Sequence, residues 1–459
     1  MSVPNFGIFE AFFGKKTASW VKRKEKIIGL NLYNNNLFAI DKQKYDSLIS
    51  KKCNLEQLKA DEPVLFSTMY KLGVIEDRWM DIPSILLMRN RQQVFSNKNY
   101  RLIIIPTLNC NFSCWYCYET HTKKKMNKEV LESIVKLIEN LIKEEKIASL
   151  HLDFFGGEPL LCFDTILKPV CIAAKKLCSE NNINFHVSMT TNAFFITEKM
   201  IPFFIEHNVT GFQITLDCNK ENHDKIRFYG KNKNGSYDTI VKNINLLAET
   251  RKINVMLRIN YTKSSMDSCT EIINHIPAVI RKEIQIALAQ IWQDRSEKTD
   301  FDRKSLLKRE NKIYNIFKKY NFKVRTSQFL GNVQHTCYAD LHNSAVINYD
   351  GRVFKCTTPD FEKAIEEGIL TSDGNIIWNE ELVMKRLARA TFDNKICLKC
   401  SLLPICSGGC STNPAFTKMR NNTCTFKPKL QQNIMSLMQQ FDKTGYNYCH
   451  VSKIQNMLQ

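Results

Sequence analysis

The spacing of hydrophobic and polar positions changes near residue 100, where short β-rich apolar runs begin to alternate with helical segments. This alternation is typical of a parallel sheet built from βα units. Apolar runs predict strands at residues 102–107, 150–155, 185–190, 211–217, 253–260 and 284–292. Helices are expected near residues 127–145, 162–180, 197–207, 236–250, 266–276 and 301–320. The pattern predicts an α/β fold, a partial (β/α)6 barrel of the TIM type with its chemistry on the loops after the strands.

The two flanks of this barrel carry different patterns. Residues 1–99 are expected to form a small N-terminal α/β domain. Its strand-like pieces are residues 27–32 and 37–40, and its helix-like pieces are residues 42–50, 55–59 and 64–72. After the barrel segment 100–328, a cysteine-rich domain at 329–430 precedes a helical tail at 431–459. The cysteine-rich domain has few long apolar runs, so we expect bound metal to stabilise it.

Composition narrows the class of protein. No apolar run approaches the roughly twenty residues that cross a bilayer, and Glu10 interrupts the apolar stretch near the N-terminus, so neither a membrane span nor a signal peptide is expected. The expected location is the cytoplasm, where thiols stay reduced and 17 cysteines favour metal binding over disulfides. The formal charge of +19 comes with lysines scattered over helix faces, which favours solvated surface over a dedicated nucleic-acid partner.

Three cysteines follow the first predicted barrel strand, with the spacing Cys110-x3-Cys114-x2-Cys117. A loop this short can wrap three thiolates around one iron–sulfur cluster. Three ligands for four irons leave one iron open, as a catalytic zinc keeps one position for its reactant. The alternative is a zinc ion held by the same cysteines and His121.

In this loop and after the second strand, the sequence resembles the radical SAM superfamily, whose signature is three cysteines separated by three and two residues. Tyr116 matches the aromatic residue that lies near the adenine of S-adenosylmethionine (SAM) in that family. Gly156, Gly157 and Glu158 match the element that binds the methionine amino group, for which a carboxylate is a suitable partner. The resemblance implies a catalytic [4Fe–4S] cluster on the three cysteines.

Two further matches follow the third and fourth strands. Thr191 and Asn192 stand where the family contacts the ribose and methionine of SAM. Residues 215–227 are similar to a stretch of peptide-modifying members in which an arginine, here Arg227, pairs with the SAM carboxylate. Cys218 replaces the usual glycine of that stretch, which leaves the local turn geometry open.

The cysteine-rich segment resembles the SPASM domain, which carries two auxiliary iron–sulfur clusters. Its cysteines are spaced as Cys337-x18-Cys356, with Gly351 between, then Cys397-x2-Cys400-x5-Cys406-x3-Cys410-x13-Cys424. By this resemblance Cys397, Cys400, Cys406 and Cys424 would hold the outer cluster, and Cys337, Cys356 and Cys410 the inner one. The implied cofactors are therefore SAM and three [4Fe–4S] clusters, one catalytic and two auxiliary. A ribbon holding two zinc ions is the alternative.

Two polar residues and seven further cysteines have less specific interpretations. Arg258 and Asn260, at the end of the fifth predicted strand, suit either the SAM site or a structural role. The other cysteines are interpreted as core or incidental thiols: Cys53, Cys162, Cys171, Cys178, Cys218, Cys269 and Cys449.

The resemblance implies post-translational maturation of a ribosomally made peptide, by thioether, carbon–carbon or epimerising chemistry. The implied partners are a peptide or protein substrate with a leader segment and an electron donor such as flavodoxin or ferredoxin. Residues 28–40 are expected to form a hairpin whose edge strand accepts the leader, and a plain capping role is equally open. The non-catalytic alternative is an iron–sulfur or zinc protein that transfers electrons or binds a partner.

The enzymatic alternative is an anaerobic sulfatase-maturating enzyme that forms formylglycine. Those enzymes place an aspartate, their base, directly after the cysteine of the Gly-x4-Cys element. Here Thr357 follows Cys356, and the nearest carboxylate is Asp360, which is the one catalytic candidate. This departure counts against formylglycine formation.

Overall fold

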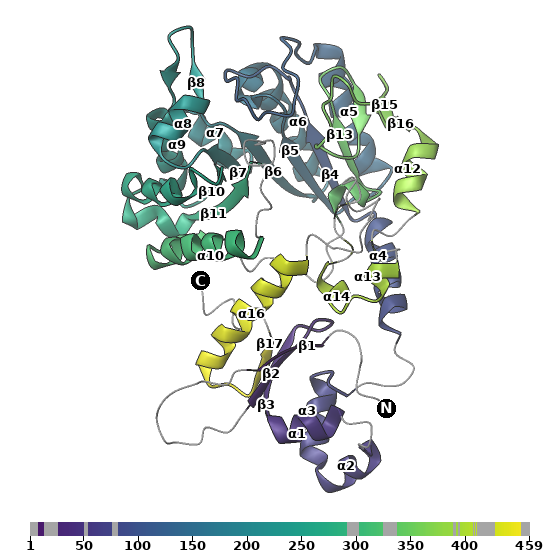
Figure 1. The fold of residues 1–459 in the computed structure, drawn as a ribbon. Coiled ribbons are helices and arrows are strands. Elements are labelled where there is room, and N and C mark those ends of the chain that lie inside the picture. The colour runs from purple at the N-terminus through teal and green to yellow at the C-terminus, as the bar shows by residue number, and fades with distance from the viewer. Residues whose placement is uncertain are drawn as a thin grey trace. The chain divides into compact units, whose positions relative to one another are not determined.

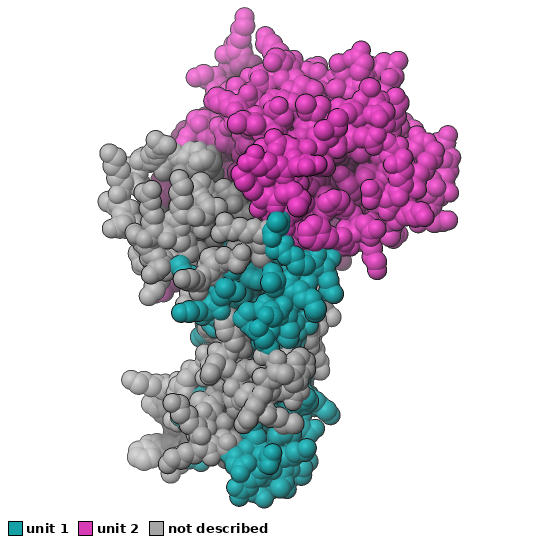
Figure 2. All heavy atoms as spheres, turned by 90° about the vertical axis from the view of Figure 1, so that its right-hand side faces the viewer, with its two compact units in different colours: residues 1–93, 326–337, 388–459 teal, residues 94–325, 338–387 magenta. Residues whose placement is uncertain are grey.

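The computed structural model describes residues 8–12, 26–49, 54–75, 81–291, 303–324, 337–388, 392, 395–406, 408, 410 and 427–450. Contacts divide the chain into two compact units, coloured separately in Figure 2. The barrel unit comprises residues 94–325 and 338–387, and the flanking unit comprises residues 1–93, 326–337 and 388–459. Two borders of these units, at residues 93/94 and 325/326, lie close to the expected domain boundaries at 99 and 328, whereas no border lies near residue 430.

Six parallel strands form the centre of the barrel unit and lie side by side in chain order (Figure 1). They are β4 (Asn99–Ile104), β5 (Ser149–Phe154), β6 (Asn184–Thr191), β7 (Val209–Leu216), β10 (Asn254–Tyr261) and β11 (Ile284–Gln290). The predicted α/β fold with a partial barrel is confirmed. The sheet stays open, because β12 (Lys323–Val324) pairs with β11 at one side and β13 (Ser344–Ile347) pairs with β4 at the other.

Helices connect the strands near the predicted positions. They are α5 (Lys128–Lys143), η1 (Pro159–Cys162), η2 (Phe163–Leu167), α6 (Lys168–Glu180), η3 (Glu198–Met200), α7 (Ile201–Glu206), α8 (Lys220–Ile226), α9 (Tyr237–Glu249), η4 (Met266–His275), η5 (Ala278–Glu283) and α10 (Arg303–Lys319). The segment expected as a helix at 266–276 is a 3-10 helix. The α5 helix begins where the Asn127 side chain accepts a hydrogen bond from Val130 N–H, and it buries Ile134, Leu137, Ile138 and Leu141 at helical spacing.

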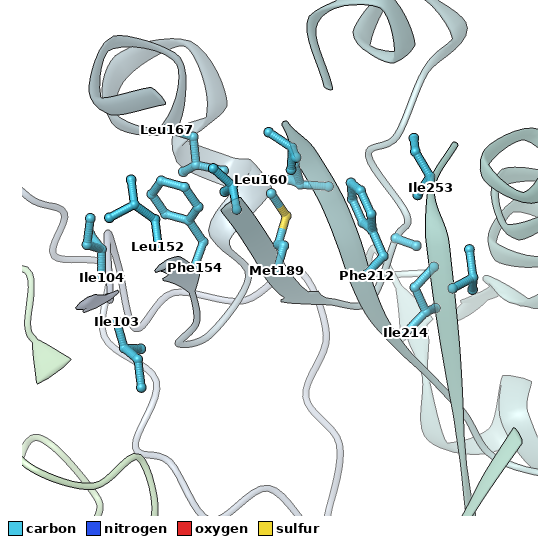
Figure 3. Close-up of a cluster of buried hydrophobic side chains, with 14 of the residues drawn as sticks. Ile103, Ile104, Leu152, Phe154, Leu160, Leu167, Met189, Phe212, Ile214 and Ile253 are labelled. Carbon is cyan, nitrogen blue, oxygen red and sulfur yellow. The ribbon is translucent and has the colours of Figure 1, made fainter. Parts of the chain in front are cut away.

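An apolar row crosses all six central strands in register and explains why they form one sheet. The row consists of Ile104, Phe154, Met189, Phe212, Val255 and Ile284. Each of these side chains is buried, and Figure 3 shows four of them together with Leu160 and Leu167, which come from η1 and η2. Because side chains alternate along a strand, this row fixes which residues lie on the other face.

The opposite face of the same strands carries polar side chains. Asp153 lies in register between Ile103 and Ser188, and it accepts hydrogen bonds from Arg101 Nε (2.6 Å) and from Ser188 Oγ. Burial raises the pKa of Asp153, but the contacts with His151 and Arg101 outweigh it and lower the pKa to about 2. The face opposite the apolar row therefore carries polar side chains at Asp153 and Ser188, next to the buried apolar side chain of Ile103.

Residues 338–387 continue the barrel sheet rather than forming a separate fold. After η6 (Tyr338–Asp340) and β13, the antiparallel strands β14 (Arg352–Phe354), β15 (Gly368–Leu370) and β16 (Ile376–Trp378) follow, and then α12 (Glu380–Leu387). Part of the expected cysteine-rich domain thus belongs to the barrel unit. A small hairpin of β8 (Phe228–Tyr229) and β9 (Asn234–Gly235) completes this unit.

The flanking unit is built on a four-stranded antiparallel sheet of order β1-β2-β3-β17. Its elements are β1 (Ile8–Phe12), β2 (Lys26–Asn31), β3 (Asn36–Asp41), α1 (Lys42–Ile49), α2 (Leu55–Asp61), α3 (Pro63–Lys71), α13 (Lys395–Leu398), α14 (Leu403–Cys406), α16 (Lys427–Thr444) and β17 (Tyr448–His450). Helix α4 (Ile82–Val94), which the sequence patterns did not indicate, ends at the boundary of the unit. No helix among the described residues is long and apolar enough to span a membrane.

The predicted hairpin at residues 28–40 is present, as β2 and β3 joined at residues 32–35. The expectation that it offers an edge strand is wrong. Strand β2 pairs with β1, and residues 36–38 of β3 pair with β17, so both hairpin strands lie inside the sheet. The C-terminal segment, which was expected to be only a helical tail, supplies the pairing strand.

We predict that Phe441→Ala destabilises the flanking unit. Phe441 of α16 is fully buried in a cluster with Ile28, Leu30 and Leu37 of the sheet. Truncating a buried Phe costs about 3–5 kcal/mol. Thermal unfolding and limited proteolysis of the purified variant measure the effect. Lys443→Ala, at an exposed position of the same helix, is the matched control and should unfold like the wild type; equal behaviour of the two variants would contradict this packing.

Candidate active site at the carboxyl ends of the strands

The loop that carries Cys110, Cys114 and Cys117, here called the cysteine loop, begins directly after β4. Its two ends are joined to each other by hydrogen bonds. Thr107 forms a bridge with Lys125 and donates from its hydroxyl to Lys124 O at 2.6 Å. Cys110 and Cys114 are half-buried and Cys117 is exposed, and none of these three thiols is in a disulfide. Burial, followed by the nearby charge of Glu158, raises the pKa of Cys110 to about 12. His121 Nε2 lies 3.4 Å from Cys117 Sγ, so the structure keeps the fourth residue of the zinc alternative nearby.

The two glycines after β5 pack on the backbone of the cysteine loop. Gly156 has φ +116°, and a Cβ there would lie 2.6 Å from Thr107 O. A Cβ on Gly157 would lie 2.3 Å from Asn109 O. Because the two segments lie so close together, Gly157 N–H donates a hydrogen bond to Thr107 O, and Glu158 N–H donates one to Asn109 O. The glycines therefore let this turn approach the chain's own cysteine loop.

Glu158 joins the glycine turn to the end of β6. Its side chain is fully buried and accepts hydrogen bonds from Leu160 N–H (3.0 Å), Thr191 Oγ1 (2.7 Å) and Asn192 N–H (2.8 Å). Burial raises the pKa of Glu158, while these three donors oppose the shift. A carboxylate has about four acceptor positions. The three hydrogen bonds use three of them on Glu158, so one position on Oε2 remains.

Thr191 and Asn192 lie where the sequence predicted them, at the carboxyl end of β6. Both are buried, and Asn192 Nδ2 donates to Asn111 Oδ1 of the cysteine loop at 2.7 Å. The same nitrogen lies 3.9 Å from Cys110 Sγ. Two strand-end turns are thereby attached to the cysteine loop.

A buried polar network links the cysteine loop to β7 and β10. The Tyr116 hydroxyl donates to Asp217 Oδ1 (2.6 Å) and accepts from Arg227 Nη2 (2.8 Å) and Asn260 Nδ2 (2.9 Å). Arg227 Nε donates to Asp217 Oδ2 at 2.5 Å. All four side chains are buried. Burial alone would lower the pKa of Arg227, but Tyr116, Cys114 and Asp217 raise it well above its usual value.

His223 and Asp224 support this network, the latter by accepting from Ser236 N–H at 2.8 Å, although sequence reasoning assigned them no role. His223 Nδ1 accepts from Asp217 N–H (3.3 Å), and its Nε2 contacts Ser236 Oγ (3.0 Å). Ser236 Oγ in turn donates to Arg227 O at 2.6 Å. Burial lowers the pKa of His223 well below its usual value, which keeps the ring neutral. The sequence could have indicated both residues, because they lie between Asp217 and Arg227 in the stretch that is similar to peptide-modifying members of the family.

The weaker candidates, Arg258 and Asn260, lie in different surroundings. Asn260 belongs to the buried network, whereas Arg258 is exposed and donates from Nε to Asn260 Oδ1 at 3.1 Å. Cys218 adopts φ +52°, the left-handed region in which glycine is usual, and it is paired with Cys269 in a disulfide. Both cysteines are buried in the barrel core, which fits their interpretation as core or incidental thiols, but they are paired with each other rather than free. Their approach follows from the turn after β7, which directs Cys218 toward η4.

Asp360 holds the segment after the third cysteine. Its Oδ1 accepts from Thr120 N–H (3.1 Å), its Oδ2 accepts from Thr120 Oγ1 (2.7 Å), and Lys363 Nζ lies 3.2 Å from Oδ2. Burial raises the pKa of Asp360, but the hydrogen bonds from Thr120 and Lys363 lower it overall. Glu119, which the sequence reasoning missed, is buried beside it, and burial followed by the Asp360 charge raises the pKa of Glu119 to about 7.

The cysteines of the C-terminal array lie in both units. Cys356, which is buried, belongs to the barrel unit, and Cys337, Cys397, Cys400, Cys406 and Cys410 belong to the flanking unit. Short helical turns carry Cys397 and Cys406, while Cys424, like the incidental Cys53, lies outside the described residues. No three His, Cys, Asp or Glu side chains of the described residues converge closely enough to hold a single metal ion. The assignment of auxiliary ligands stays a prediction.

Comparison with known proteins agrees with this geometry. The family model described as the radical SAM superfamily matches residues 104–273. An uncharacterized protein of Methanocaldococcus jannaschii is 26% identical over 262 residues, which is 56% of this chain and 84% of the relative. The radical SAM cyclopropyl synthase TigE of Paramaledivibacter caminithermalis is 25% identical over 161 residues, 32% of each chain.

Two solved structures share the fold. The structure of anSMEcpe with bound AdoMet and a peptide has a TM-score of 0.54 at 18% identity, covering 74% of this chain and 98% of that one. Streptococcus suis SuiB bound to S-adenosylmethionine has a TM-score of 0.50 at 15% identity, covering 86% and 93% of the two chains.

We predict that Gly157→Ala separates the turn after β5 from the cysteine loop. The added Cβ meets backbone atoms of Leu108 and Asn109, which cannot rotate away as a side chain can. We expect a loss of about 1–3 kcal/mol in unfolding free energy, measured by denaturant titration, and faster hydrogen exchange at residues 107–109. Ser113→Ala, at an exposed position of the cysteine loop, should change neither; an unchanged Gly157→Ala protein would refute the close packing.

Proposed function

We propose that the chain, whose residues 104–273 match the model of the radical SAM superfamily, is an enzyme of this superfamily that modifies a peptide or protein substrate and carries a SPASM-type cysteine-rich domain. The observation that carries the proposal is the meeting of three features at one edge of the sheet: the cysteine loop, the glycine turn with Glu158, and the buried Tyr116–Asp217–Arg227 network. Each follows a different parallel strand, and carboxyl ends of parallel strands share an edge.

The cysteine loop suits an iron–sulfur cluster with an open iron. It offers three thiols within eight residues, none in a disulfide, and the charge of Arg227 lowers the pKa of Cys110 and Cys114 against the effect of burial. A reduced [4Fe–4S] cluster and SAM, when both are bound there, would supply the chemistry: reductive cleavage of SAM gives a 5′-deoxyadenosyl radical, which abstracts hydrogen. Cys110, Cys114 and Cys117 would hold this cluster.

The surrounding residues bind and orient SAM in this proposal. Glu158 has one acceptor position left for the ammonium group. Arg227 uses two of its five N–H donors on Asp217 and Tyr116, and the others are available for the carboxylate. Tyr116 is fixed by three hydrogen bonds, so its ring is held beside the adenine. Fixed partners reduce the reorganisation needed when SAM binds.

The choice of substrate class rests on the relatives. TigE is a cyclopropyl synthase, SuiB is recorded with its precursor peptide, and anSMEcpe is recorded with a peptide. We infer that this chain acts in peptide maturation, by thioether, carbon–carbon or epimerising chemistry, with electrons from a flavodoxin or ferredoxin. Two auxiliary clusters on the C-terminal array are part of this proposal.

The formylglycine-forming alternative needs a carboxylate base near the substrate. Asp360 is the one carboxylate that follows Cys356 closely, and its two oxygens already accept from Thr120 while Lys363 pairs with it. This arrangement favours a positioning role for Asp360 over proton abstraction, and it therefore weighs against that alternative.

We predict that the anaerobically reconstituted, dithionite-reduced protein converts SAM to 5′-deoxyadenosine and methionine, and that Cys114→Ala abolishes this. Three cubane clusters correspond to about twelve irons per chain, and loss of the catalytic cluster leaves about eight. Iron analysis and chromatography of 5′-deoxyadenosine measure both. Cys178→Ala, which alters a buried thiol of α6, is the control and should retain cleavage. Stoichiometric zinc with little iron would contradict the proposal.

We predict that Arg227→Lys weakens SAM binding by about tenfold or more while iron content is unchanged. Lysine keeps the charge but lacks the planar fork that contacts Asp217 and Tyr116 at once. Equilibrium binding of SAM to the reconstituted variant gives the affinity. If the affinity equals that of the wild type, Arg227 does not contact SAM.

A further inference from the structure

The segment after the third cysteine is hydrogen-bonded to a loop about 240 residues later in the chain. The Tyr118 hydroxyl donates to Thr357 O at 2.8 Å, with a sequence separation of 239 residues. Thr120 donates from its backbone and hydroxyl to the two oxygens of Asp360, at 3.1 and 2.7 Å. We call Tyr118, Thr120, Thr357 and Asp360 the clasp. All four residues belong to the barrel unit.

The two ends of the clasp adjoin proposed iron ligands. Tyr118 directly follows Cys117, and Thr357 directly follows Cys356. The Cys356 sulfur is itself held locally, since it accepts from Thr358 N–H at 3.4 Å and lies 3.1 Å from Thr358 Oγ1. Each cysteine is therefore one peptide bond away from a residue that is hydrogen-bonded to the other loop.

Tyr338 braces the clasp from the other side. Its hydroxyl accepts from Thr357 N–H at 3.1 Å and lies 2.8 Å from Thr357 Oγ1. The Arg101 guanidinium of β4 lies over the Tyr338 ring, 5.0 Å from its centroid. Thr357 is thus fixed by Tyr118, by Tyr338 and, through Tyr338, by the first barrel strand. Packed and hydrogen-bonded groups have few alternative arrangements, and networks of this kind can carry coupling between two sites.

The contacts of Asp360 favour a role in holding the clasp together over a role as a reactive carboxylate. Both of its oxygens accept from Thr120, and Glu362 N–H donates to Oδ1 at 3.3 Å. Lys363, the remaining partner, has a largely exposed side chain. Substituting Lys363 therefore changes the charge near Asp360 and leaves the hydrogen bonds to Thr120 in place.

We propose that the clasp couples the two cysteine loops, so that iron bound at Cys356 tightens SAM binding at the cysteine loop, with Asp360 as a positioning residue. This inference rests on the proposed function for the presence of iron and SAM. Coupling between two sites is reciprocal, so SAM binding should equally stabilise iron at Cys356. The clasp provides the connection that such coupling requires.

A double-mutant cycle on SAM affinity tests the clasp. In the otherwise wild-type protein, Cys356→Ser should weaken SAM binding by about tenfold, within the usual range for coupled sites. In the Tyr118→Phe/Asp360→Asn background, the same Cys356→Ser change should weaken binding less than about twofold. Lys363→Met is the matched control and should keep the full tenfold effect. A Thr120→Val variant, which removes only the hydroxyl donor, should give an intermediate value.

The electron paramagnetic resonance signal of the catalytic cluster with SAM is the second readout. It should change with Cys356→Ser when the clasp is intact and stay constant when the clasp is broken. Equal effects of Cys356→Ser in both backgrounds would overturn the coupling. Unchanged coupling in the Asp360→Asn single variant, together with loss of product formation, would overturn the positioning role and make Asp360 a base instead. A wild-type protein that binds no SAM would refute the proposed function itself, and the clasp's role with it.

Discussion

The close packing of the Gly156–Gly157 turn on the backbone of residues 107–109 is the contact on which the candidate site depends. Neither position has room for a Cβ, so only glycine permits the two strand-end loops to exchange hydrogen bonds. This packing carries Glu158 to a fully buried position, and Glu158 in turn orders the Thr191–Asn192 turn. Three consecutive strands are thus tied together at one edge before any cofactor is considered.

Charge balance is the second constraint. Asp217 and Arg227 are buried as a pair, and the Tyr116 hydroxyl bonds to both. Removing one member of such a pair leaves the other charge buried without compensation, which is costly. The neutral ring of His223 supports Asp217 without adding a charge. The network therefore presents the guanidinium in a fixed direction, which is what recognition of a carboxylate needs.

Local patterns in the sequence predicted the barrel, and the resemblance to the radical SAM superfamily indicated the residues at its strand ends. Alternating burial marks β5 and β6, and Gly156, Gly157 and Glu158 follow β5 directly. Long-range pairings could not be predicted. The β3–β17 pairing joins residues more than 400 positions apart, and nothing in the short strand at Tyr448 identifies its partner. The same applies to Thr120 and Asp360, whose contact depends on where β13 joins the sheet beside β4.

The proposed chemistry requires that SAM binds the open iron of a cluster on Cys110, Cys114 and Cys117. The most direct measurement is the electron paramagnetic resonance spectrum of the dithionite-reduced protein, recorded before and after SAM is added, in a variant that lacks the C-terminal array cysteines. If SAM binds this iron, the signal of the reduced cluster should shift when SAM is added. A signal that SAM leaves unchanged, or no iron signal in a correctly folded protein, would contradict it.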